Sequence, residues 1–241
     1  MVVGGEKDEC RYVAEQYVCV LLLTTLKPIL TKMDRYGFKN VILPVDIIVQ
    51  HPEVWPFVTQ YLPFYRTFAK PLPRPIHATD PSQSLKIDAI FVYHDPRDWA
   101  TDSTVILDLL LSHKGILGTL SPLNGREDLP NKGFQQDDQP SLFFSNGDLL
   151  WPAKYHLPRL AQGGFREALE GVWAAVTGGP AAGIELKKTV IGKPTHLTYS
   201  FAEKKLNEYR STLFSGEQLN ALKTVYMVGD NPGMHPLCHQ S

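Results

Sequence analysis

The stretch that decides the fold is KIDAIFVYHDP (residues 86–96) followed by DWATDSTVILDLLLSHKG (residues 98–115). The apolar run in the first segment is rich in β-forming residues and predicts a buried strand. In the second segment Asp98 can cap a helix and Gly115 can end it. The apolar face of this predicted helix consists of Val105, Ile106, Leu109 and Leu110. A strand followed by a helix is the unit from which α/β proteins are built.

The same alternation recurs along the chain. Strand-like runs lie in SLFFSNGD (141–148), KKTVIGKP (187–194) and KTVYMVGDNP (223–232), and helix-like runs lie in GFREALEGVWAAVTGG (164–179) and THLTYSFAEKKLNEYR (195–210). Strands separated by helix-sized segments predict parallel pairing. Residues 52–81 are rich in proline and predict a long irregular connection, and residues 121–140 predict a loop.

The composition indicates a globular protein without a strong charge preference. Of the 241 residues 43% are apolar, which is enough for a core, and 24 basic residues nearly balance 25 acidic ones. This balance points neither to nucleic acid nor to a membrane surface as the partner. The most apolar stretch, residues 18–26, has about half the length of a membrane span, so we expect no membrane span. Three scattered cysteines favour a reducing compartment.

Three predicted strands end in small, polar or charged residues. These ends are Ser145-Asn146-Gly147-Asp148, Gly192-Lys193-Pro194 and Gly229-Asp230-Asn231-Pro232. Ligands of open parallel sheets bind beyond the carboxyl ends of strands, so each loop is a candidate site. Ordinary turn chemistry also explains these residue types, and that alternative stays open. A lysine and an aspartate at neighbouring strand ends suit phosphoryl transfer, the lysine for phosphate charge and the aspartate for Mg²⁺.

Several segments resemble a known family. VIGKPTHLTY (190–199) and VYMVGDNP (225–232) resemble the third and fourth motifs of the haloacid dehalogenase (HAD) superfamily. Five further segments resemble subfamily IIA of this superfamily, and within it the cat eye syndrome critical region protein 5-like branch, especially its fungal members. These segments are GFKNVILPVDI (37–47), HPEVWPF (51–57), FVYHDPRDWATD (91–102), FFSNGDLLW (143–151) and LPRLAQGGFREALEGVW (157–173). The resemblance implies a HAD-like α/β fold, with an α/β cap domain at residues 1–188 and part of a Rossmann-like core at residues 189–241.

The same resemblance implies roles for individual residues. Lys193 would neutralise the aspartyl nucleophile and the transferring phosphate, and Asp230 would ligate Mg²⁺, with Asn231 supporting its loop. The substrate-facing loop would consist of Ser145, Asn146 and Asp148. The family's first motif, which carries the nucleophilic aspartate, has no counterpart in the sequence. His235 stands where the family has a second acid, so the implied Mg²⁺ site is incomplete.

Residues 18–35 interrupt the family pattern, because VAEQ (13–16) and YGFKNV (36–41) are adjacent in it. The codons at the two ends of this segment can contain fungal-type splice signals, and its length keeps the reading frame. We hypothesise a retained intron, with a genuine family insertion as the alternative. The tail after Pro232 also leaves the family pattern.

The sequence thus predicts a fragment of a Mg²⁺-dependent HAD-type phosphatase that would act on a small phosphorylated metabolite through an aspartyl-phosphate. We expect this fragment to be inactive as given, because it lacks the nucleophile. The alternative is a non-catalytic binding or scaffold protein built on a HAD cap and linked to mitochondrial glycerophospholipid metabolism. The resemblance implies a mitochondrial location, with a cytoplasmic one otherwise. The expected partner is a small phosphorylated molecule and not nucleic acid, and the sequence does not predict the oligomeric state.

Overall fold

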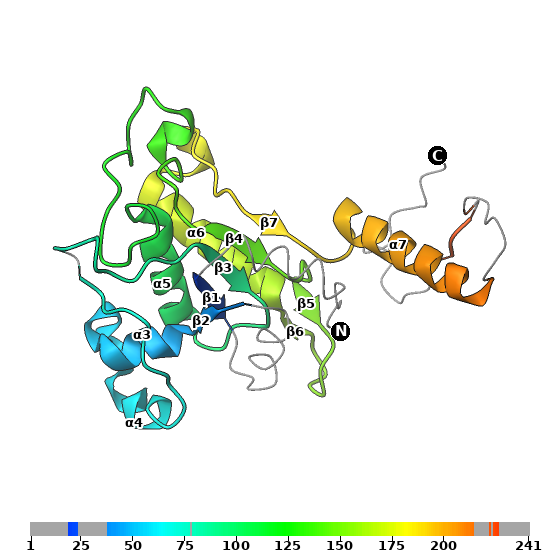
Figure 1. The fold of residues 1–241 in the computed structure, drawn as a ribbon, viewed down its shortest axis with the longest axis horizontal. Coiled ribbons are helices and arrows are strands. Elements are labelled where there is room, and N and C mark those ends of the chain that lie inside the picture. Colours follow the sequence, from blue (N-terminus) through cyan, green and yellow to red (C-terminus); the bar gives the residue numbers. More distant parts are fainter. Residues whose placement is uncertain (1–18, 24–37, 78, 215–221, 223, 227–241) are drawn as a thin grey trace.

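The fold centres on a five-stranded parallel sheet (Figure 1). The computed structural model describes residues 19–23, 38–77, 79–214, 222 and 224–226. The strands of the sheet are β1 (Cys19–Leu23), β2 (Asn40–Ile42), β3 (Ala89–Val92), β4 (Ser141–Phe144) and β7 (Thr189–Val190). They lie in the order β2-β1-β3-β4-β7, and each neighbouring pair is parallel. The predicted α/β class and the predicted parallel pairing are confirmed.

The helices differ widely in length. The α-helices are α3 (Pro44–Gln50), α4 (Leu62–Tyr65), α5 (Trp99–Leu111), α6 (Gln162–Thr177) and α7 (His196–Leu213). The 3-10 helices are η1 (Pro52–Val54), η2 (Pro56–Tyr61), η3 (Pro130–Gly133) and η4 (Pro180–Ala182). A separate antiparallel pair consists of β5 (Leu150–Trp151) and β6 (Arg159–Leu160). Among the described helices, none combines the length and the apolarity that crossing a bilayer requires.

The strand and the helix predicted from residues 86–115 are β3 and α5. Asp98 caps α5, because its Oδ1 accepts a hydrogen bond from the backbone N–H of Thr101 at 3.1 Å and its Oδ2 accepts one from the Thr101 hydroxyl at 2.7 Å. The helix ends at Leu111, before the predicted Gly115, because Ser112 already has extended backbone angles. The predicted apolar face is completely buried at Val105, Ile106, Leu109 and Leu110.

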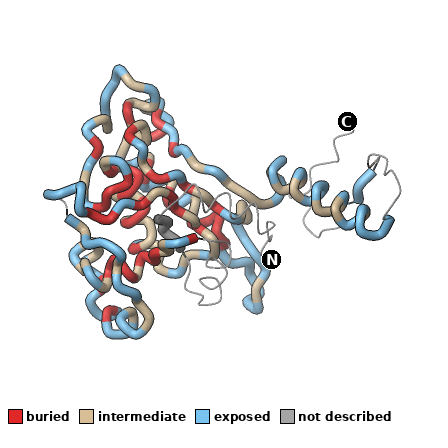
Figure 2. Tube along the Cα trace, viewed as in Figure 1, coloured by how far each residue is buried: buried red, intermediate tan, exposed pale blue. Residues whose placement is uncertain are grey.

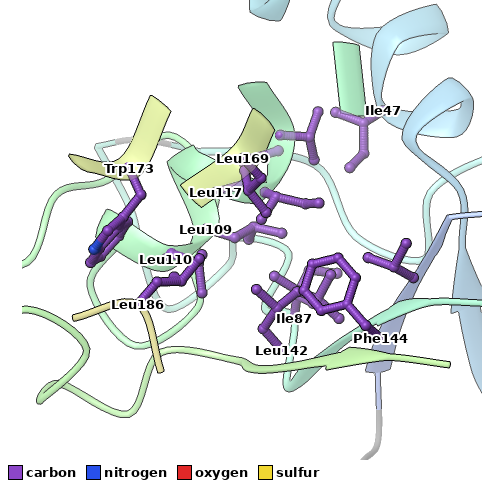
Figure 3. Packing of buried hydrophobic residues seen from close by; sticks show 14 of the residues in the cluster. Ile47, Ile87, Leu109, Leu110, Leu117, Leu142, Phe144, Leu169, Trp173 and Leu186 are labelled. Carbon is purple, nitrogen blue, oxygen red and sulfur yellow. The ribbon is translucent and has the colours of Figure 1, made fainter. Parts of the chain in front are cut away.

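The core lies on one face of the sheet, under α3, α5 and α6 (Figure 3). The strand residues on that face are Ile90, Val92, Leu142 and Phe144, and they form one buried cluster with side chains of the three helices. The opposite face carries Phe91 and Phe143, whose stacked rings have centroids 4.9 Å apart. Figure 2 shows the buried residues gathered around the sheet, whereas α7 extends away from it and contains no buried residue.

Two stretches that the sequence predicts to be irregular have defined structure, one as short helices and the other through side-chain hydrogen bonds. The prediction of a wholly irregular connection at residues 52–81 is wrong, since η1, η2 and α4 occupy residues 52–65. Each of these three helices has a proline in its first turn, where a missing N–H leaves no helical bond unmade. In the loop at residues 121–140, the side-chain amides of Asn131 and Gln135 each bond both the N–H and the C=O of one residue, Glu185 and Lys187 respectively, at 2.8 to 3.1 Å.

The five-stranded sheet includes strands from both sides of the predicted domain boundary at residue 188 and from the predicted insert at residues 18–35. Residues 19–23, inside the predicted insert 18–35, form β1, which pairs with β2 on one side and β3 on the other. β7 begins just after the predicted boundary at residue 188 and pairs with β4 of the preceding unit. The retained intron and the domain boundary both stay predictions. The last predicted strand, at residues 223–232, lies mostly outside the described residues, and residues 224–226 form no strand.

A second acid of α5 lies one turn beyond the cap. Asp102 follows Asp98 by four residues, so the two carboxylates lie on the same side of the helix. Burial, and after it the negative charge of Asp98, raises the pKa of Asp102 to about 8. From α4, Tyr65 donates its hydroxyl to Asp98 Oδ2 at 3.2 Å. Burial and the charge of Asp98 raise the pKa of Tyr65 to about 12. The hydrogen bond between Tyr65 and Asp98 attaches α4 to the start of α5.

We predict that Asp102→Asn stabilises the protein increasingly as the pH rises from about 4 to about 8. The native state binds the Asp102 proton more tightly than the unfolded chain does, so the charged carboxylate lowers the free energy of unfolding above its unfolded-state pKa. The gain at pH 8 should be on the order of 1–3 kcal/mol, and it should vanish near pH 4. Thermal unfolding at a series of pH values measures it. The exposed Asp138→Asn is the control, and an equal pH dependence in both variants would contradict the prediction.

Candidate functional site

Three strands of the sheet present their carboxyl ends side by side. Because β3, β4 and β7 are parallel neighbours, the segments that follow them leave the sheet at the same edge. The N–H of Ser145 donates to Val92 O at 3.1 Å, and the N–H of Ile191 donates to Phe144 O at 2.8 Å, so the pairing continues past the strands. We call residues 145–148 the β4 loop and residues 191–194 the β7 loop. Both loops begin at the same level of the sheet.

The β4 loop and the β7 loop are in direct contact. A Cβ atom built on Gly192 would lie 3.4 Å from both Ser145 O and Asn146 Cα. A Cβ atom built on Gly147 would lie 3.6 Å from Lys193 O. Gly192 also has φ of +116°, a backbone conformation that other residues rarely adopt. The structure therefore brings the three predicted substrate-facing residues next to the backbone that carries Lys193, while the roles of these residues stay predictions.

Hydrogen bonds within the protein fix the shape of the β4 loop. The hydroxyl of Ser145 donates to Tyr93 O at 2.9 Å, which ties this loop to the end of β3. The side-chain oxygen of Asn146 accepts from the N–H of Asp148 at 2.9 Å and closes a tight turn. In the described part of the chain, Asp148 Oδ1 is buried without a hydrogen-bond partner. Two of the three predicted substrate-facing side chains thus also hold the loop in its conformation.

Gln162, the first residue of α6, is a site-forming residue that the sequence interpretation missed. Its side chain is only 1% exposed, and its Oε1 accepts from the N–H of Asn146 at 2.9 Å. Its Nε2 donates to the hydroxyl of Ser145 at 3.3 Å. One buried amide therefore satisfies two polar groups of the β4 loop. The only signal in the sequence is its position before two glycines at the start of a predicted helix.

Gly163 allows the start of α6 to approach the β4 loop. Its N–H donates to Asp148 O at 2.8 Å. A Cβ atom at this position would lie 2.6 Å from Asp148 O and 2.7 Å from Gly147 O, and both of these atoms belong to the backbone. Any side chain larger than hydrogen would therefore push the β4 loop away from α6.

Lys193 lies at the exposed edge of the site, on a backbone held by α7. The N–H of Gly192 donates to the Thr198 hydroxyl at 2.9 Å, and the Thr195 hydroxyl donates to Gly192 O at 2.7 Å. The Lys193 side chain itself is exposed. Its ammonium group can therefore meet an anion that approaches the edge of the sheet from solvent.

The predicted metal residues cannot be placed, because Asp230 and Asn231 lie outside the described residues. Within the described ranges, no group of three His, Cys, Asp or Glu side chains is arranged to hold a metal ion. The donor set that the family resemblance implies for Mg²⁺ would therefore have to include Asp230. The geometry of the β4 and β7 loops provides sites for hydrogen bonding and for one cation, Lys193.

Two hollows of the described structure lie away from the β4 and β7 loops. One of about 200 Å³ lies beside β2, with Lys39, Asp46 and Lys70 in its wall. The other, of about 330 Å³, lies beside α5, with Trp55 and Trp99 in its wall. Neither is lined by a residue of the two loops. The candidate site lies instead where the carboxyl ends of β4 and β7 converge.

The fold and the site define an open parallel α/β protein with polar loops at the carboxyl ends of its strands. No family model matches the chain. A cardiolipin synthase (CMP-forming)/mitochondrial hydrolase fusion protein of Schizosaccharomyces pombe is 34% identical over 224 residues, which are 92% of this chain and 33% of that protein. A mitochondrial hydrolase of Saccharomyces cerevisiae is 31% identical over 216 residues, which are 83% of this chain and 54% of that protein.

The chain is similar to these mitochondrial hydrolases, and its motifs resemble those of the haloacid dehalogenase-like hydrolases. It spans about a third of the length of the first relative and about half of the second. A solved structure from Cytophaga hutchinsonii, described as a possible sugar phosphatase of the HAD superfamily, matches 83% of this chain and 75% of its own chain. That match has 13% identity and a TM-score of 0.32.

Two glycines of α6 provide a matched test of the contact between this helix and the β4 loop. We predict that Gly163→Ala lowers the free energy of unfolding by about 1–3 kcal/mol, because its methyl group meets the backbone of the loop. Gly171→Ala meets no atom within 4 Å and should raise the free energy of unfolding by up to about 1 kcal/mol through helix propensity. Chemical denaturation measures both values. Equal effects of the two substitutions would contradict the proposed close approach.

Proposed function

We propose that the β4 loop and Lys193 form the substrate-facing side of a phosphoryl-transfer hydrolase that acts on a small phosphorylated metabolite. The contact between Gly192 and the β4 loop carries this proposal, because it joins a polar loop and a lysine at one edge of the sheet. An exposed ammonium group forms strong charge-assisted hydrogen bonds with phosphate oxygens. The β4 loop would then contact the rest of the substrate and determine which metabolite fits.

In this proposal Lys193 binds the phosphate and offsets its negative charge. The hydrogen bonds of Gly192 with Thr195 and Thr198 hold the backbone next to Lys193. The position of the Lys193 Cα atom is therefore fixed, while its side chain can extend toward the phosphate. An aspartyl-phosphate intermediate would need a carboxylate from a DxDG-type segment, and residues 1–241 contain no such segment. We therefore propose that these residues alone do not hydrolyse phosphoesters, since a covalent mechanism needs its nucleophile.

Mg²⁺ would supply charge neutralisation on the phosphate oxygens of a complete enzyme. We propose Asp230 as its protein ligand, with Asn231 supporting that loop. His235 occupies the position of the second acid and offers no carboxylate there. A single carboxylate would leave the ion dependent on water and substrate phosphate for its other ligands. The cap would be of the subfamily IIA type.

The names of the relatives support a location and a substrate class. Both are named mitochondrial hydrolases, and we propose the mitochondrion as the location of this protein. One is named a fusion with a cardiolipin synthase, so we propose that the substrate belongs to glycerophospholipid metabolism. The same fusion favours a second candidate, a non-catalytic scaffold, because a covalent link keeps two units together whether or not one of them turns over substrate.

We predict that Lys193→Ala weakens the binding of glycerol phosphate and of inorganic phosphate by roughly 10- to 100-fold, because it removes a charge-assisted hydrogen bond. Isothermal titration calorimetry on the full chain measures the dissociation constants. Lys86→Ala, which removes an exposed lysine before the start of β3 and hence at the opposite end of this strand from the two loops, should leave them unchanged. A phosphatase assay with Mg²⁺ on sugar phosphates and glycerol phosphate should detect no turnover by residues 1–241.

Two results would contradict different parts of this proposal. Turnover that disappears in Lys193→Ala would confirm the site and overturn the proposed inactivity of the chain. Phosphate binding that is absent, or that is equal in Lys193→Ala and the unaltered chain, would overturn the assignment of Lys193 and favour the scaffold.

A further inference from the structure

A second surface, far along the chain from Lys193, combines exposed aromatic rings with positive charge. It is formed by residues 55–74, which include η2 and α4 and which we call the aromatic arm. Its side chains form an inner stripe that packs against the rest of the fold and an outer stripe that faces solvent. Val58 and Leu62 are buried against Ile48 of α3. Tyr65 packs against the same cluster, and these three side chains form the inner stripe. Phe57, Tyr61 and Phe64 each precede one of them, are 72%, 52% and 64% exposed, and form the outer stripe.

The aromatic arm is fixed to the rest of the fold at two points. Tyr65 donates its hydroxyl to Asp98 Oδ2 at 3.2 Å. The N–H of Lys70 donates to Oδ1 of the buried Asp46 at 2.7 Å, and Asp46 also caps the start of α3. Because the inner stripe is already packed, the outer rings cannot turn inward without breaking these contacts. Figure 1 shows α4 at the lower left edge of the described structure, and Figure 2 shows much of this region exposed.

Positive charge accompanies the exposed rings. The arm carries Arg66, Lys70 and Arg74, all exposed, and no Asp or Glu occurs at residues 54–79. Glu53, just before the arm, is paired with His51 at 3.0 Å. The near-neutral charge of the whole chain, which did not point to a membrane surface, therefore conceals a local excess of positive charge.

We propose that the aromatic arm docks on the surface of a membrane that contains anionic phospholipids. A tyrosine ring is favoured at the depth of lipid headgroups, because its ring is apolar and its hydroxyl stays wet. Exposed phenylalanine rings can bury their apolar faces at the boundary between headgroups and acyl chains. Each lysine or arginine close to an anionic bilayer raises binding about fivefold. A second copy of this chain fits less well, because two arms face to face would bring their cations together. The docking is peripheral, as the arm lies on the bilayer and does not cross it.

Vesicle sedimentation with the full chain tests this proposal. The chain should bind vesicles of phosphatidylcholine mixed with phosphatidylglycerol, and it should bind pure phosphatidylcholine vesicles much more weakly. Arg66→Gln combined with Lys70→Gln should reduce binding to the mixed vesicles by roughly 25-fold. Phe57→Ser combined with Phe64→Ser should reduce binding to both kinds of vesicle. Rising salt should weaken the binding of the unaltered chain and affect the double Gln variant less.

The control variants alter the same residue types elsewhere. Lys154→Gln combined with Lys187→Gln removes two exposed cations, and Tyr155→Ser removes a ring that is 53% exposed. Both should bind like the unaltered chain, and circular dichroism should give the same folded signal for all variants. The proposal is overturned if the unaltered chain binds no anionic vesicles, or if the arm variants bind as well as the controls. It is also overturned if the arm variants abolish only self-association, measured by sedimentation velocity.

Discussion

The candidate site depends on the parallel pairing of β4 with β7. This pairing is short: Phe143 lies beside Thr189, Phe144 lies beside Val190, and the N–H of Ile191 donates to Phe144 O at 2.8 Å. Phe144 is completely buried, so the core holds the β4 side of the pair in place. The β7 loop takes its position relative to the β4 loop from this contact, and α7 beyond it has no buried residue of its own.

A strand of two residues needs support from outside the sheet. The segment that leads into β7 receives it from the loop at residues 121–140, where Asn131 bonds both backbone groups of Glu185 and Gln135 bonds both of Lys187. These side-chain amides imitate the pairing of a neighbouring strand. On the other side of the site, Gln162 and the start of α6 hold the β4 loop. Residues distant in sequence thus fix both halves of one small site.

The sequence predicted the parts of the fold that follow from local pattern. Periodic apolar residues identified α5, and Asp98 marked its start. Polar residues at the ends of predicted strands identified both loops, because parallel strands present their carboxyl ends at one edge. Pattern alone could not identify Gln162, because its partners lie 16 and 17 residues away and meet it only after α6 packs. The prolines of η1, η2 and α4 are a local signal for helix starts, but a proline-rich composition also predicts an irregular segment, and composition alone does not separate the two.

The central claim is that the β4 and β7 loops form one phosphate-binding site. Nuclear magnetic resonance on the isotope-labelled chain tests this directly, by following backbone amide signals during a titration with glycerol phosphate. If the claim is correct, the signals of Asn146 and Gly147 in one loop and of Gly192 and Lys193 in the other shift together with a single midpoint. Shifts confined to one loop, or different midpoints for the two loops, would contradict it.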